Sequence, residues 1–180
     1  MGVLILKDFF LVTTFQEHNQ VKEILLDKLN CAESHTIAKK EPLHNYDNLD
    51  IISKTDYWID NREEEYIRFI YPLLKEHCRN LFSHTTANDV SFTNIWFQQY
   101  ENSNFHGWHT HPNTHFTNIY FLELPNNTFK TEIKDLQGNI INYKCLEGDI
   151  LTFPGFYSHQ SPVIETDQRK TIISFNIELL

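Results

Sequence analysis

The stretch HGWHTHPNTHFTNIYFLELP, residues 106–125, joins a cluster of four histidines to a run of aromatic and β-branched residues. Such residues favour β-strands. From Ser91 onward the chain continues as short β-type runs separated by turn residues. The expected strands are Phe92–Tyr100, Gly107–His111, His115–Leu124, Phe129–Asp135, Ile140–Cys145, Asp149–Phe153, His159–Val163 and Thr171–Leu179.

The first 90 residues have a different pattern. Val3–Val12 is apolar and predicts a strand. Apolar residues at helical spacing predict one helix over residues 14–29 and a second over Glu63–Phe82, which Pro72 would kink or split. Residues 32–60 are polar, and we expect them to form a long irregular segment beside the opening of a pocket.

Together these elements predict an α+β chain that is mainly β. We expect a double-stranded β-helix, or jelly-roll, core with the N-terminal helices packed on one sheet. The length of 180 residues fits a single domain, residues 1–180. Residues 1–90 would provide the first strand, the helices and connections, and residues 91–180 the core.

Composition argues against several classes of function. The net charge is −9 and no basic stripe is present, so we do not expect nucleic acid as a partner. The three cysteines are odd in number and widely spaced, which argues against a disulfide framework and favours a reducing compartment. No apolar run has membrane-spanning length, and the N-terminus lacks the features of a signal peptide. We therefore expect a cytoplasmic protein.

The histidine cluster has the spacing of a metal site. Residues two apart on a strand point to the same face, so His109 and His111 could bind one metal ion. His159 follows a turn and would return as a third ligand on another strand. Imidazoles suit iron, zinc, copper or nickel. Any one of these residues alone is as well explained as a surface or core histidine, and we expect His106 and His115 to be neighbours, not ligands.

An arginine lies ten residues beyond His159. Arg169 would share one strand face with Thr171. A guanidinium that points into a barrel requires an anion. A dicarboxylate would supply it, with the Thr171 hydroxyl adding a hydrogen bond. The alternative is a surface arginine at the end of the polar run ETDQRK.

Four segments, in order, then carry a resemblance that spans residues 96–177: HTHP, TNIYFLELP, GDILTFPGFYSH and QRKTIISFN. This order resembles that of a family of iron(II)/2-oxoglutarate-dependent oxygenases of the double-stranded β-helix superfamily. The resemblance implies that iron(II) is bound by His109, His111 and His159. It also implies that the distal carboxylate of 2-oxoglutarate is held by Arg169 and Thr171, with Tyr120 as a further candidate. In the wider superfamily the second ligand is usually a carboxylate, where this chain has a histidine.

The resemblance implies an oxygenase, and first of all a hydroxylase, that couples decarboxylation of 2-oxoglutarate to oxidation of a substrate by O2. The substrate would be a small molecule or a peptidyl side chain. Two alternatives stay open. One is a cupin-type metalloenzyme that does not use 2-oxoglutarate, and the other is a non-catalytic jelly-roll binding module.

Overall fold

The computed structural model describes residues 9–39, 50–59 and 63–180. Its strands form one curled antiparallel sheet in the order β1-β8-β6-β10-β4-β3-β5-β9-β7, with β2 beside β3. The elements are β1 Leu11–Thr14, α1 His18–Cys31, β2 His35–Lys39, β3 Asp50–Thr55, α2 Glu65–Leu81, β4 Val90–Tyr100, β5 Phe105–His109, β6 Phe116–Glu123, the 3₁₀ turn Asn127–Phe129, β7 Glu132–Ile133, β8 Asp149–Pro154, β9 His159–Ser161 and β10 Lys170–Leu179.

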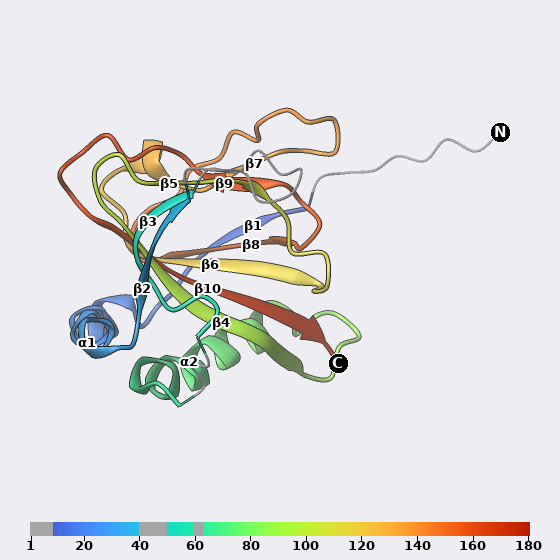
Figure 1. Ribbon diagram of the computed structural model, residues 1–180. Helices are drawn as coiled ribbons and strands as arrows, with labels where there is room; N and C mark the ends of the chain where they lie inside the picture. The colour runs from blue at the N-terminus through green and yellow to red at the C-terminus, as the bar shows by residue number, and fades with distance from the viewer. Residues whose placement is uncertain (1–8, 40–49, 60–62) are drawn as a thin grey trace.

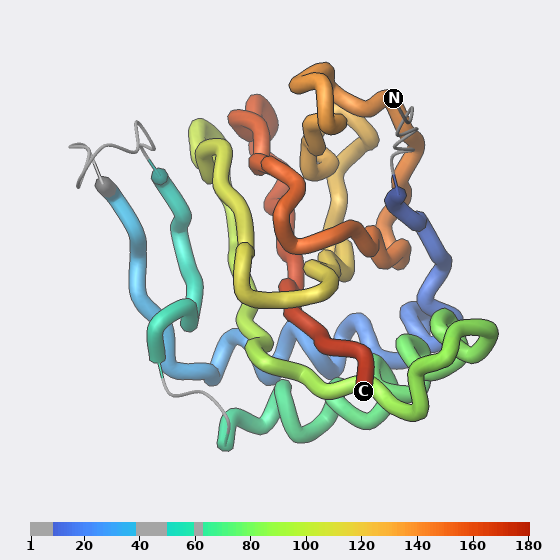
Figure 2. The backbone as a smooth tube through the Cα atoms, turned by 90° about the vertical axis from the view of Figure 1, so that its right-hand side faces the viewer, coloured from blue at the N-terminus to red at the C-terminus, as the bar shows by residue number. Residues whose placement is uncertain are grey.

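The sheet folds over on itself into two layers. Strands β5, β9 and β7 lie opposite β1, β8, β6, β10 and β4, and the two helices lie beyond the second layer (Figure 1). In the view of Figure 2, both helices lie below the strands. This is the predicted architecture, a mainly β double-stranded β-helix with helices packed on one sheet.

Strand alternation divides the core into two clusters, one on each face of the second layer. On β10, Ile173 and Phe175 pack with buried residues of the helices. Ile172, which precedes them, packs with the inner cluster around Phe121 and Phe153. Cross-strand partners share a face, so this alternation decides which side chains point into the space between the two layers.

Helix α2 is continuous through Pro72. Its buried stripe includes Tyr66, Ile70 and Leu74, whereas Pro72 lies on the exposed side. Proline removes one backbone hydrogen bond of the helix. On the exposed side, water can satisfy the carbonyl that loses its partner, so the predicted break does not occur.

The N-terminal part corrects three predictions. The first described strand is β1, later than predicted, and Val3–Asp8 lies outside the described residues. Helix α1 begins at His18 and not at Thr14, because Thr14 still pairs with Asp149 of β8. Within the segment 32–60 that we expected to be irregular, the described residues form β2 and β3.

The predicted strand Ile140–Cys145 is also wrong. Only an isolated bridge between Lys134 and Ile140 forms there. The backbone N–H of Cys145 donates to the side chain of Asn127 at 2.8 Å, so a side chain and not a neighbouring strand satisfies it. The predicted strand Phe129–Asp135 is shortened to β7.

The cysteines Cys31, Cys78 and Cys145 are free thiols, in agreement with the absence of a disulfide framework. None of the helices that the structure describes is both long and apolar enough to cross a membrane.

Candidate metal centre

Three histidines meet between the two layers of the sheet. One ring nitrogen of each of His109, His111 and His159 lies within 4.8 Å of the others. Their ring centroids are 4.2 to 5.2 Å apart. Nitrogen atoms at these separations can bind a single metal ion with a small adjustment of the side chains, because a metal–nitrogen bond is about 2 Å long.

Each histidine reaches this point from a different local structure. His109 ends β5 and pairs with His159 of β9 across the sheet. His111 lies beyond the end of β5, in the connection to β6. Its backbone N–H donates to the carbonyl of Gly155 at 2.7 Å, which fixes the position of the connection. Strand alternation predicted the pair correctly as neighbours, but the expectation that both lie on one strand is wrong.

Hydrogen bonds orient two of the rings. The Nδ1 atom of His109 lies 2.8 Å from the carbonyl oxygen of Gly107, and that of His159 lies 3.1 Å from the carbonyl oxygen of Tyr157. A carbonyl only accepts, so each Nδ1 must carry the proton and donate. The Nε2 lone pair of each ring is then free to bind a metal.

The third ring is held differently. The Nδ1 atom of His111 lies 3.5 Å from the side-chain amide of Asn176, and its ring centroid lies 5.5 Å from that of Trp96. An Asn176 amide turned with its oxygen toward the ring would accept the Nδ1 proton, leaving Nε2 to bind a metal. Asn176 and Trp96 thus both contact His111.

Burial keeps the three imidazoles neutral. It lowers the pKa of His109, lowers the pKa of His111 to about 4, and lowers the pKa of His159 well below its ordinary value. The charge of the neighbouring imidazoles adds to this effect at His111 and His159. Neutral imidazole is the form that binds metals, so the centre is prepared for a cation at neutral pH.

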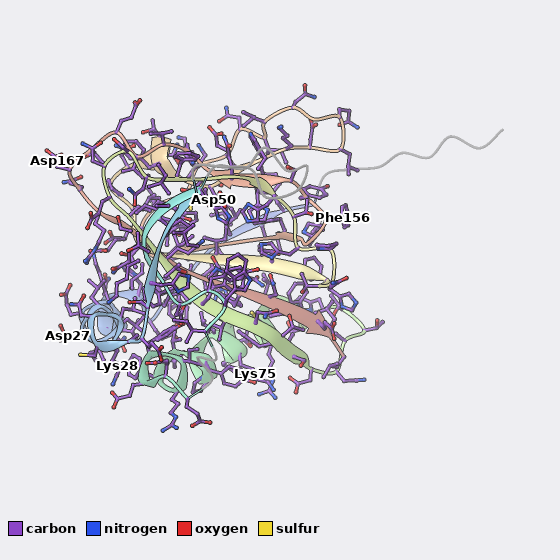
Figure 3. All side chains as sticks on the ribbon, viewed as in Figure 1. Asp27, Lys28, Asp50, Lys75, Phe156 and Asp167 are labelled. Carbon is purple, nitrogen blue, oxygen red and sulfur yellow. The ribbon has the colours of Figure 1, made fainter. Side chains whose placement is uncertain are left out.

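The other two histidines of the cluster behave differently from each other. His106 stacks on His109, with ring centroids 3.9 Å apart and planes inclined by 20°. A register shift between these two residues places both rings on the inner side. Asp50 lies 3.9 Å from Nε2 of His106, on the side of the sheet away from Lys75 of α2 (Figure 3). His115, by contrast, accepts a hydrogen bond from the backbone of Leu179.

A buried lysine shares the interior with the histidines. Lys170 begins β10, pairs with Tyr100 across the sheet, and is completely buried. Its Nζ atom donates to the Ser161 hydroxyl at 2.7 Å. Ser161 and Tyr100 in turn line the same hollow as His109 and His159. No carboxylate of the described residues lies within ion-pair distance of Lys170.

The surroundings of Lys170 are short of polar partners. Burial lowers its pKa to about 7. Among the residues that the structure describes, the buried Tyr100 hydroxyl has no hydrogen-bond partner of normal geometry, although Ser161 lies close to it. An unpaired buried hydroxyl beside a buried ammonium is unfavourable unless an acceptor joins them. The hollow has a volume of about 10 Å³, which is room for about one water molecule.

The structure does not bring the predicted anion-binding residues to the histidines. Arg169 forms a bidentate ion pair with Glu123, with distances of 2.7 and 3.0 Å, and the Thr171 hydroxyl donates to the same carboxylate. Tyr120 lies on the helix side of the sheet, where its hydroxyl is 2.7 Å from Nδ1 of His18. The predicted face of β10 is wrong, because the even-numbered residues from Lys170 onward point inward.

A signal for Lys170 was present in the sequence. Lys170, Ile172 and Ser174 alternate with the strongly apolar Ile173 and Phe175. The helices need an apolar face to pack against, and only the odd-numbered residues provide it. When this requirement is applied to β10, it predicts that Lys170, and not Arg169, points toward the metal centre.

Comparison with known proteins defines the class of fold. The sequence matches no family model and no curated protein. Solved structures do match, and they place the chain in the double-stranded β-helix fold of 2-oxoglutarate/iron(II) oxygenases.

Three structures illustrate the similarity. The epimerase SnoN of nogalamycin biosynthesis, described as α-ketoglutarate dependent, has a TM-score of 0.70 at 12% identity, over 94% of this chain and 77% of its own. A prolyl hydroxylase from Trichoplax adhaerens has a TM-score of 0.64 at 14% identity, over 94% and 83%. An oxidoreductase of the 2OG-Fe(II) oxygenase family from Burkholderia pseudomallei has a TM-score of 0.64 at 8% identity, over 94% and 85%.

Proposed function

We propose that the protein is an iron(II)- and 2-oxoglutarate-dependent oxygenase whose iron is held by His109, His111 and His159. The donor set fits iron, because three neutral imidazoles on one side of an ion leave positions open for other ligands. Zinc or copper would accept the same nitrogens. The observation that favours an iron and 2-oxoglutarate site over a zinc or copper site is Lys170, which is buried in the same interior.

We further propose that Lys170 takes the role first assigned to Arg169. A carboxylate beside its ammonium would supply the charged acceptor that the buried cation lacks. The same carboxylate could accept from the Tyr100 hydroxyl and lie beside Ser161. In this arrangement the carboxylate would bind the Lys170 ammonium and the Tyr100 hydroxyl, which have few hydrogen-bond partners in the barrel interior. Arg169 and Thr171, by contrast, already donate hydrogen bonds to Glu123.

When bound, iron and 2-oxoglutarate supply the oxidising chemistry, in which O2, 2-oxoglutarate and a substrate C–H bond give succinate, CO2 and a C–OH bond. The chain contributes by holding the three imidazoles neutral, binding the distal carboxylate and excluding water. We take hydroxylation as the reaction, as in the similar prolyl hydroxylase, although a similar epimerase has the same fold.

The small hollow at the histidines has a consequence for this function. A volume of about 10 Å³ does not accommodate 2-oxoglutarate. Binding must therefore move some of the side chains that line the hollow. A cupin-type enzyme without 2-oxoglutarate would have no need of Lys170, so the buried lysine favours the oxygenase.

Anaerobic titration with Fe(II) and then 2-oxoglutarate tests the proposal. A bidentate keto acid on iron(II) produces a visible charge-transfer band, and we expect this band in the wild-type protein and its loss in His159→Ala. Protein that binds iron but shows no band would exclude the oxygenase and leave the cupin-type enzyme. Protein that binds neither iron nor 2-oxoglutarate would leave the non-catalytic binding module.

A further inference from the structure

We propose that the groove between β4 and α2 binds the substrate as an extended, uncharged peptide segment that leads to the metal centre. This inference rests on the proposed function and adds the class of substrate. The groove has a volume of about 980 Å³. It is lined by Asp56–Ile59, by Ile67, Arg68, Tyr71 and Pro72 of α2, and by Phe92–Trp96 of β4.

The groove adjoins the metal centre. Trp96 lines both the groove and the hollow that contains the three histidines. Tyr57 and Asn94 line the groove and also a second hollow of about 220 Å³ that His111 borders. A ligand that fills the groove and extends past Tyr57 and Asn94 would therefore have one end beside His111, where a reactive group must lie.

The shape of the groove favours an extended chain. Five consecutive residues of β4, from Phe92 to Trp96, line it. Successive side chains of a strand point to opposite faces, so a run of consecutive lining residues means that the groove follows the edge of the strand. Pairing of β3 with β4 is limited to Gln98 and Gln99, beyond this run. Five residues at about 3.3 Å per residue span roughly 13 Å, which matches a peptide of four to five residues.

The aromatic side chains of the groove do not form a flat slot. The ring planes are inclined by 43° between Tyr57 and Trp58, by 54° between Tyr57 and Trp96, and by 62° between Tyr71 and Phe92. A planar polycyclic molecule would be stabilised by parallel faces. Inclined rings instead provide separate surfaces for the side chains of a peptide.

Trp58 shows a second sign of a binding role. Its side chain is 70% exposed, and its backbone φ is 72°, in the left-handed region that large residues rarely adopt. This conformation is unfavourable and holds an indole in solvent at the groove. Strained backbone at an exposed aromatic residue is typical of binding sites.

The charges of the groove indicate an uncharged ligand. The oxygens of Asp56 accept from the Tyr66 hydroxyl and the backbone N–H of Phe97. The Arg68 guanidinium pairs with Glu63. The described lining of the groove thus has one acidic and one basic side chain, each with a partner, and no excess of either charge, so binding should depend little on salt.

Fluorotryptophan labelling and ¹⁹F NMR provide a direct test, since the chain has three tryptophans. Trp58 and Trp96 line the groove, whereas Trp108 lies beside Lys134, whose Nζ is 4.0 Å from the ring centroid. The probes are acetylated, amidated pentapeptides with glycine at the outer positions and each uncharged residue in turn at the centre. We expect saturable, salt-independent shifts of the Trp58 and Trp96 signals and an unchanged Trp108 signal.

A matched pair of variants separates binding from folding. Trp58→Gly removes the indole and suits the left-handed backbone, and we expect it to weaken peptide binding about tenfold. Leu146→Ala changes a side chain that is 69% exposed outside the groove and should have no effect. No shift with any peptide, or equal shifts of all three signals, would overturn the proposal. Saturable binding of acridine in place of the peptides would overturn it in favour of a planar small molecule.

The NMR measurement is made without iron or 2-oxoglutarate, so it is independent of the charge-transfer band. Peptide binding without the band would refute the oxygenase and retain the groove. The band without peptide binding would refute the groove and retain the oxygenase.

Discussion

At the scale of single residues, Lys170 separates the proposed function from its alternatives. Lys170→Met keeps an unbranched side chain of similar length and removes the cation. We expect the affinity for 2-oxoglutarate to fall roughly 30-fold, as for loss of a charged hydrogen bond worth about 2 kcal/mol. Titration of the charge-transfer band measures this change. Arg169→Met is the control and should leave the affinity unchanged, because Arg169 is paired with Glu123. The reverse result would restore the original assignment.

The same lysine predicts a pH dependence. Its pKa of about 7 means that only part of the population carries the charge at neutral pH. A carboxylate binds the protonated form, so the affinity for 2-oxoglutarate should fall as pH rises from 7 to 9, approaching tenfold per pH unit. Calorimetry in buffers of different ionisation enthalpy should also detect proton uptake on binding. An affinity that is constant over this range would contradict the role of Lys170.

His106 and His115 form a natural pair for comparison. His106 stacks on the proposed ligand His109, whereas His115 binds the backbone at Leu179. Residues that orient a ligand typically change metal affinity by about 10- to 100-fold. We expect His106→Ala to weaken Fe(II) binding about tenfold, measured by competition with a chelator, and His115→Ala to leave it unchanged. Equal effects of both substitutions would refute the positioning role.

At the scale of elements, we expect the turn after β8 to fix the position of His111 in the metal centre. A Cβ atom at Gly155 would lie 2.4 Å from the backbone oxygen of His111 and 2.8 Å from that of Thr114. Gly155→Ala must therefore displace the connection that carries His111, and we expect loss of metal binding together with lower stability. Metal titration and thermal unfolding measure the two effects.

Gly138→Ala is the matched control for this turn. Gly138 has a φ of 88°, and a Cβ atom at this position would meet no other atom within 4 Å, so the substitution strains the backbone without a clash. We expect a loss of about 1 kcal/mol in unfolding free energy and unchanged metal binding. Normal metal binding by Gly155→Ala would show that the turn does not position His111.

The elements also show where sequence reasoning succeeds. Runs of β-type residues between turn signals located β4, β6, β8 and β10 closely, because these strands are long and buried. The bulge in β5 was not predictable, since it depends on the pairing of His106 and His109 with β9. Alternation alone could not assign a face to Lys170 without knowledge of which face the helices cover.

At the scale of the whole molecule, the buried histidines predict acid sensitivity. Unfolded histidine has a pKa of about 6.5, whereas burial lowers the pKa of His111 to about 4 and lowers those of His109 and His159. The unfolded state then binds more protons below this ordinary pKa, so stability is lost as pH falls through this range. Each histidine contributes up to about 1.4 kcal/mol per pH unit.

Urea unfolding of the metal-free protein between pH 7 and 5 measures this loss, in a range above most carboxylate titration. Bound metal should resist the change down to the pH at which protons displace it. A stability that is constant between pH 7 and 5 would show that the three imidazoles are not buried as neutral groups.

The architecture as a whole was predictable from the sequence to a large extent. The change from helical to strand periodicity near residue 90 indicated a β core covered by helices, and the structure confirms it. Strands β2 and β3 were not predicted from the polar segment before α2, because edge strands and partly exposed strands lack a strong apolar pattern in the sequence. That the chain forms one domain stays a prediction.

The pairing of β1 with β8 bears on how the chain is made. Thr14 pairs with Asp149, so the partner of β1 is synthesised 135 residues after it. During vectorial synthesis β1 has no edge to join until β8 leaves the ribosome, and His159 appears later still. We expect nascent chains that stop before residue 149 to expose β1 and to require a chaperone. Metal acquisition would therefore follow synthesis of all the strands up to β9, which carries His159.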